Sequence, residues 1–136
     1  MRAVVDTNVL AAALLAREGP PARILREWVD GAFELVVSPL LLDELARVLA
    51  YPKLASSIDA DDARELRLLL VGAMVMTDAD EQPAVAVADP DDAYLVVLAE
   101  RSSSLLVTGD AGLLALGPGI PVVTPAGFEA RLRAVN

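Results

Sequence analysis

Apolar runs rich in valine and leucine alternate along this chain with segments whose apolar residues recur at helical spacing. The runs lack the period-two alternation of a half-exposed strand, so they suit a parallel sheet covered by helices on both faces. Strands are expected over residues 3–5, 33–37, 73–77, 105–108 and 122–123. Helices are expected over residues 9–16, 21–30, 39–50, 60–70, 90–102, 111–116 and 125–134. This order predicts an α/β fold, a three-layer α/β/α sandwich around a mostly parallel five-stranded sheet.

Prolines mark the starts of several predicted helices, because proline fits the first helical turn. These residues are Pro21, Pro39, Pro90 and Pro125. Three of them directly follow residues that favour the N-cap position, namely Ser38, Asp89 and Thr124. Pro52 is expected to end the helix over 39–50.

Length and composition indicate one domain over residues 1–136, since a chain of this size that is 55% hydrophobic can build its own core. The sequence has no cysteine, and its start does not resemble a secretion signal. Apolar stretches such as residues 9–16 are far shorter than the roughly 20 residues that a bilayer requires. We therefore expect a cytoplasmic protein that does not enter membranes.

The net charge of −9, from 20 acidic and 11 basic residues, argues against broad, sequence-independent adhesion to nucleic acid. Lys53 is the only lysine. Any contact with nucleic acid must therefore be local. Five arginines could line a phosphate path or could simply be solvated on helix faces: Arg17, Arg23, Arg26, Arg64 and Arg67.

The chain has no histidine and no cysteine, which removes a thiolate nucleophile, a zinc tetrad and a Ser-His-Asp relay from consideration. The remaining option for hydrolytic chemistry is a set of oxygen ligands that hold Mg²⁺ or Mn²⁺. The carboxylates that could form such a set follow predicted strands or lie on predicted helices.

Asp6 and Asp110 each follow a predicted strand, at the carboxyl edge where open α/β sheets bind ligands. Two such residues at like ends of one parallel sheet are expected to lie near each other. The alternative is that Asp6 or its neighbour Asn8 merely caps the next helix.

Glu44 falls on the border of the apolar stripe of its predicted helix, whereas Asp43 and Arg47 point further outward. A carboxylate turned toward the core needs a partner, which a cation at the sheet edge would supply. The alternative is a solvated residue with Arg47 as a loose neighbour.

Asp89, Asp91 and Asp92 form an acidic run at the start of a predicted helix. The partial positive charge of a helix N-terminus favours acidic residues even where they bind no ligand. Asp92, however, shares a helical sector with Val96 and Ala99 on the inward side, so we favour Asp92 as a ligand and Asp91 second. If the carboxylates converge, they must bind cations or take up protons. One or two Mg²⁺ ions would then activate water for hydrolysis of a phosphodiester.

The ordered set of these pieces resembles the PIN domain, the metal-dependent ribonuclease fold of many VapC-like toxins in toxin-antitoxin systems. The pieces are Val4-Val5-Asp6-Thr7-Asn8, Asp89-Pro90-Asp91-Asp92, Thr108-Gly109-Asp110 and the segments 19–25, 35–39, 42–45 and 120–125. The resemblance implies that Asp6, Glu44, Asp92 and Asp110 bind Mg²⁺ or Mn²⁺ and cleave single-stranded RNA. It also implies a homodimer and a small antitoxin protein whose C-terminal segment covers the cleft.

The chain departs from the subgroup of toxin components that it resembles at two places. Ala93 and Tyr94 stand where further charged residues are common, and Ala111-Gly112 stands where an aromatic residue or an aspartate is common. The carboxylates are unaffected, so these departures concern the binding of the substrate and its turnover.

Other readings fit less well or remain open. A haloacid-dehalogenase-like domain requires an aspartate at the position of Asn8, and a receiver-like domain requires a lysine at a late strand end, whereas Lys53 follows a helix. A catalytically weak or inactive PIN-fold domain that serves as a protein-interaction module fits the same residues.

Overall fold

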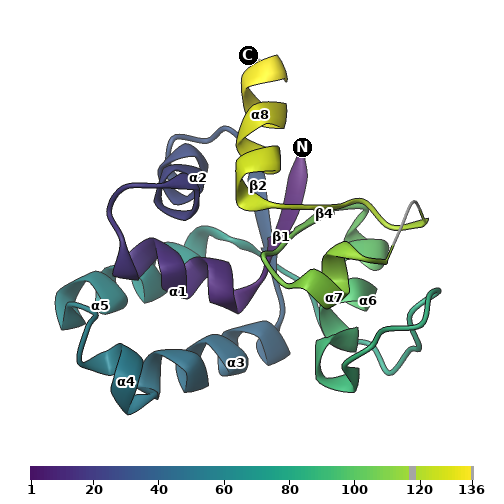
Figure 1. Ribbon diagram of the computed structural model, residues 1–136, viewed down its shortest axis with the longest axis horizontal. Coiled ribbons are helices and arrows are strands. Elements are labelled where there is room, and N and C mark those ends of the chain that lie inside the picture. Colours follow the sequence, from purple (N-terminus) through teal and green to yellow (C-terminus); the bar gives the residue numbers. More distant parts are fainter. Residues whose placement is uncertain (117–118, 136) are drawn as a thin grey trace.

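A single parallel sheet forms the centre of the protein, as the computed structural model of residues 1–116 and 119–135 shows (Figure 1). Within these residues five strands pair in the order β3-β2-β1-β4-β5. They are β1 (Arg2–Val5), β2 (Glu34–Val37), β3 (Met74–Val75), β4 (Leu105–Val107) and β5 (Val122–Val123). The sheet is entirely parallel, with β1 in the middle, so the predicted fold class is confirmed.

The helices follow the predicted order, with differences at their ends. The main helices are α1 (Thr7–Leu15), α2 (Pro20–Val29), α3 (Pro39–Ala50), α5 (Ala60–Leu69), α6 (Ala93–Ser102) and α8 (Pro125–Val135). The predicted helix over 111–116 is shorter, since α7 covers Ala111–Leu114. The predicted strand over 73–77 shortens to β3, and the 3₁₀ turn η1 (Leu70–Gly72) precedes it.

Two short elements correct the sequence prediction. Pro52 ends α3 as expected, but it also starts a further helix, α4 (Pro52–Ala55), because its fixed φ suits a first helical position. The helix predicted from residue 90 opens as a 3₁₀ turn, η2 (Pro90–Asp92), before α6 begins.

The predicted N-caps are confirmed. The side chains of Ser38, Asp89 and Thr124 accept hydrogen bonds from the backbone N–H groups of Leu41, Asp91 and Gly127, at 3.3, 3.0 and 3.0 Å. The expected start at Pro21 is one residue late, because α2 begins at Pro20 behind Gly19, whose φ of +113° favours glycine.

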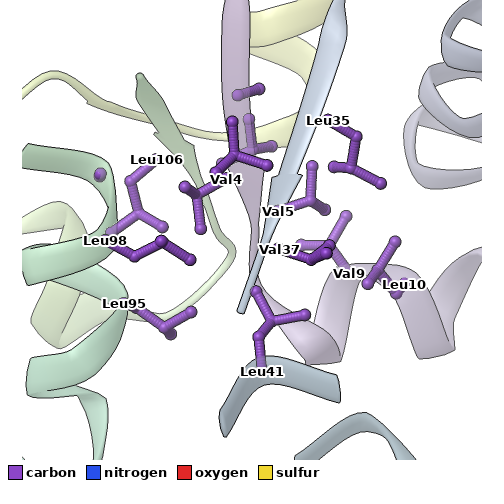
Figure 2. Packing of buried hydrophobic residues seen from close by; sticks show 14 of the residues in the cluster. Val4, Val5, Val9, Leu10, Leu35, Val37, Leu41, Leu95, Leu98 and Leu106 are labelled. Atoms are coloured by element: carbon purple, nitrogen blue, oxygen red, sulfur yellow. The ribbon is translucent and has the colours of Figure 1, made fainter. Parts of the chain in front are cut away.

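The core lies on both faces of the sheet. Val4 and Val5 of β1 are buried, and Figure 2 shows the side chains of α6, such as Leu98, on one side of the strand and those of α1, such as Val9, on the other. Strands buried on both faces explain the continuous apolar runs in the sequence.

Helix α8 is fixed to α2 by a partly buried ion pair. The guanidinium of Arg23 donates to both carboxylate oxygens of Glu129, at 2.7 and 3.1 Å, and Arg133 adds a bond of 3.2 Å. Glu129 is only 7% exposed. The hydrogen bond from Arg23 is the main cause that lowers the pKa of Glu129, so this carboxylate stays ionised at neutral pH.

The long loop 76–89 between β3 and η2 is held at several points. Arg101 donates to the carbonyl of Thr77 at 2.6 Å, and the backbone N–H of Ala84 donates to the carboxylate of Glu100 at 3.3 Å. Val85 and Val87 pack against the core. The last residues of this loop therefore have a fixed place beside η2.

Candidate metal centre

Asp6 and Asp110 lie next to each other at the carboxyl edge of the sheet, as the sequence predicts. The strands that precede them, β1 and β4, are direct neighbours, with Val5 in register with Val107. The backbone N–H of Asp6 donates to the carbonyl of Val107 at 2.9 Å, so the pairing continues to the point where the strands end.

Thr108 connects the two carboxylate-bearing segments. Its side chain is fully buried, and its hydroxyl donates to Oδ2 of Asp6 at 2.8 Å. The hydroxyl oxygen of Thr108 also accepts a hydrogen bond from the backbone N–H of Asp110 at 3.0 Å. Sequence reasoning missed this role, although the motif Thr108-Gly109-Asp110 pointed to the position.

Both aspartates also cap helices, so the alternative interpretation describes part of their role. Oδ1 of Asp6 accepts from the backbone N–H of Asn8 at 3.4 Å, and Oδ2 of Asp110 accepts from that of Leu113 at 3.0 Å. A carboxylate offers about four acceptor positions, so these bonds leave lone pairs for a cation. Asp6 is 5% exposed, which makes its orientation well defined.

Asp92 belongs to the same region electrostatically. Partial burial is the main cause that raises its pKa to about 6, and the charges of Asp6, Asp89 and Asp110 raise it further. The cap of η2 is Asp89 rather than Asp92, while Asp91 is exposed. The capping explanation of this acidic run therefore applies to Asp89, whereas the side chain of Asp92 makes no cap hydrogen bond and owes its raised pKa to burial and to the neighbouring carboxylates.

Glu44 lies at the border of the site. Its side chain is 36% exposed and accepts a hydrogen bond from Arg47, as the alternative interpretation proposed. Its charge still reaches Tyr94 on α6: burial is the main cause that raises the pKa of this phenol, followed by the charges of Glu44, Asp6 and Asp92. Tyr94 therefore lies in a field to which these carboxylates all contribute.

The donor atoms suit a hard cation, since carboxylate oxygens are the ligands that Mg²⁺ and Mn²⁺ prefer. In residues 1–116 and 119–135, however, no group of three or more acidic side chains lies close enough to hold an ion. The chemistry of the site fits the metal, whereas ligation would require the side chains to draw together. The four-residue ligand set stays a prediction.

Asp78 is a further carboxylate at this edge that sequence reasoning missed. It follows β3, and its Oδ2 accepts a hydrogen bond from the backbone N–H of Leu40 at 2.9 Å. The bond ties the loop 76–89 to the start of α3, the helix that carries Glu44. No local signal could reveal a partner 38 positions away.

The predicted phosphate path is weakened by the pairing of its arginines. Arg23 is engaged with Glu129, Arg64 with Asp61 at 2.8 Å, and Arg26 with the carbonyl of Arg17 at 3.2 Å. Arg17 and Arg26 instead line a groove between α1, α2 and α5.

The family model described as the PIN domain matches residues 2–112. The chain belongs to the PIN domain family. PIN domains are generally nucleases. The predicted resemblance is confirmed.

Among curated proteins, this PIN domain is 28% identical over 117 residues to the uncharacterized protein MJ1680 of Methanocaldococcus jannaschii. The alignment covers 85% of this chain and 75% of that protein. Among solved structures, PAE2754 from Pyrobaculum aerophilum is 26% identical with a TM-score of 0.69, over 98% of this chain and 90% of that chain. A chain of VapBC2 from Rickettsia felis, crystallised with a promoter DNA fragment, shares the fold with 13% identity and a TM-score of 0.65, over 91% of this chain and 98% of that chain.

The structure also bears on membrane insertion. Within residues 1–116 and 119–135, we find no helix that combines the length and apolar character needed to cross a bilayer.

Proposed function

We propose that this PIN domain is a Mg²⁺- or Mn²⁺-dependent endoribonuclease that cleaves single-stranded RNA. The observation that supports the proposal most directly is the hydrogen bond of 2.8 Å from Thr108 to Asp6, which also orients Asp110 through its backbone. Two strand-final carboxylates in one hydrogen-bonded unit, with the raised pKa of Asp92 beside them, form a negative site that a divalent cation would neutralise.

The residues that would hold the ion are Asp6, Asp92 and Asp110, with Glu44 completing the set from α3. A bound divalent ion supplies Lewis acidity toward a water molecule and the leaving oxygen of the phosphodiester. Thr108 orients Oδ2 of Asp6, and Leu113 orients Oδ2 of Asp110. Asp92, with its pKa near 6, can hold a proton at mildly acidic pH.

The test is cleavage of an unstructured RNA with Mn²⁺ present or chelated. The wild type should cleave only with metal, and Asp6→Asn should abolish cleavage. Asp43→Asn on the exposed side of α3 is the matched control and should retain activity. Cleavage that survives Asp6→Asn in metal-free buffer would refute the proposal.

We further propose that the domain is the toxin of a type II toxin-antitoxin pair with a small antitoxin as partner. In support, a groove of about 510 Å³ lies between α1, α2 and α5. Its lining combines apolar residues such as Leu14, Leu25 and Leu66 with two arginines, Arg17 and Arg26, and with Asp62 and Glu65 of α5. Such lining suits an amphipathic segment. Co-expression with a small basic open reading frame next to the gene should relieve toxicity if the proposal holds.

A homodimer is the assembly that we propose for the toxin. Val75 of the edge strand β3 is 58% exposed, and Leu68 and Val71, which precede this strand in sequence, are 67% and 82% exposed. Exposed apolar patches beside an edge strand favour association. Light scattering should give twice the chain mass, and Val71→Lys should shift it toward the monomer.

A second candidate function is a PIN-fold interaction module with weak or no catalysis. Among the described residues, no three acidic side chains lie close enough together to hold a metal ion, and this observation favours the alternative. Absence of cleavage at high enzyme and metal concentration, in a protein that still binds an antitoxin, would establish this alternative.

A further inference from the structure

A small pocket opens beside the proposed metal centre. It has a volume of about 270 Å³ and lies between the end of the loop 76–89 and the start of α7. Val87 and Ala88 form one wall, Gly112 and Leu113 form the other, and Asp92 and Asp110 border it. The pocket is therefore continuous with two of the proposed catalytic carboxylates.

The two facing walls are apolar and held in place, while three carboxylates, Asp89, Asp92 and Asp110, line the rest of the pocket. Leu113 is 1% exposed, and its backbone N–H is bonded to the carboxylate of Asp110 at 3.0 Å. Val87 packs against the core from the opposite side. The bond from Leu113 to Asp110 fixes the apolar wall relative to the acidic edge.

Gly112 keeps the pocket open. A Cβ atom at this position would lie 3.1 Å from Oδ2 of Asp110 and 4.0 Å from the Cβ of Ala88. Any larger residue would extend between the two walls and crowd the carboxylate. The two residues that face each other, Ala88 and Gly112, have the smallest side chains, so a narrow slot remains open between the walls.

We propose that this slot, which we call the base pocket (Val87, Ala88, Gly112 and Leu113), receives one unpaired nucleobase of the RNA next to the proposed cleavage site at Asp92 and Asp110. The inference rests on the proposed ribonuclease function and names its substrate contact. A nucleobase is flat and packs its faces on apolar side chains, and only an unpaired base can leave its stack to enter. The volume of about 270 Å³ lies just below the usual range for sites that bind drug-sized ligands, which suits a single heterocycle.

The experiment uses a short single-stranded RNA in which each base in turn is replaced by an abasic site. In the wild type, removal of one particular base beside the cleaved bond should raise KM by on the order of tenfold, whereas removal of the others should have little effect. Gly112→Ala should raise KM for the intact RNA and should erase the difference between intact and abasic RNA at that position.

Matched controls separate the base pocket from general damage. Gly72→Ala, whose Cβ would have no neighbour within 4 Å among the described residues, should keep the wild-type abasic profile. Ala88→Leu fills the slot from the opposite wall and should reproduce the effect of Gly112→Ala, so the test survives if one variant misfolds. An equal effect of every abasic site, or an unchanged abasic profile in a folded Gly112→Ala protein, would overturn the inference.

Binding measured by NMR separates this inference from the nuclease proposal. With ¹⁵N-labelled wild type, the intact RNA should shift the amide signals of Gly112 and Leu113, and the fully abasic RNA should not. If cleavage is absent but this shift occurs, the base pocket stands and the nuclease proposal fails. If neither RNA shifts these signals, or if only a free nucleoside monophosphate does, the base pocket as an RNA contact is refuted.

Discussion

The hydroxyl of Thr108 donates a buried hydrogen bond of 2.8 Å to Asp6, a residue 102 positions away in the chain. The same hydroxyl accepts from the backbone of Asp110 at 3.0 Å. One side chain thus sets the relative positions of the two strand-final carboxylates, and its removal should disturb both.

Thr108→Val keeps the shape of the side chain and removes the hydroxyl. A buried acceptor on Asp6 and a backbone donor on Asp110 would lose their partner, so we expect a loss of about 1–3 kcal/mol in unfolding free energy. RNA cleavage should also fall. Urea denaturation measures the first effect, and Thr108→Ser, which retains the hydroxyl, should stay near the wild type. Equal stability of the Val and Ser variants would contradict this role.

Asp92→Asn should change how stability depends on pH. Because the pKa of Asp92 is raised to about 6 in the folded state, the folded protein binds its proton more tightly than the unfolded chain does. This contribution is lost as pH rises from about 4 to 6. The variant should therefore match the wild type near pH 4 and be more stable at pH 7, by up to about 1 kcal/mol after solvent screening. Melting curves across this range, with the exposed Asp91→Asn as control, measure the difference.

Added Mg²⁺ or Mn²⁺ should raise the melting temperature, since an ion that binds only the folded site stabilises it by mass action. At 100 times the dissociation constant the gain is about 2.7 kcal/mol. Asp6→Asn should remove most of the gain, whereas Asp43→Asn should keep it. A melting temperature that does not change at millimolar metal concentration would argue against metal binding at this site.

Glu44→Gln tests the least central member of the proposed ligand set. We expect cleavage to fall by on the order of 100-fold if Glu44 leaves Arg47 to bind the ion, because the charge of a ligand would be lost. Asp43→Asn, one residue earlier and exposed, provides the comparison. Activity equal to that of the control would show that Glu44 is not a metal ligand and only forms a surface ion pair with Arg47.

Glu129→Gln should weaken the attachment of α8 to α2. The pKa of Glu129 is lowered by its bond with Arg23, so its stabilising effect is present above the pKa of the unfolded state and disappears as pH falls through the folded value. The loss at pH 7 should be on the order of 1 kcal/mol. Glu34→Gln breaks the exposed pair with Arg2 and should cost less, as chemical denaturation would show.

The elements and the strand-end carboxylates could be predicted because their signals are local. Proline with a preceding cap residue marks a helix start, and an apolar run marks a buried strand. Asp6 and Asp110 followed directly from parallel strand order, without knowledge of which strands are neighbours.

The contacts that orient the site could not be predicted, because they join segments distant in sequence. The bonds from Leu40 to Asp78 and from Arg23 to Glu129 depend on how helices pack on the sheet. The exposure of Glu44 depends on a small rotation of α3, which the border position of this residue in the apolar stripe left undetermined.

The register of β1 on β4, with Val5 opposite Val107, has a consequence for how this protein can change. Inserting or deleting one residue within either strand would turn the following side chains to the opposite face and separate Asp6 from Thr108. The lengths of two buried strands are thus constrained as tightly as the acidic residues themselves, although no atom of those strands' side chains need ever meet the substrate.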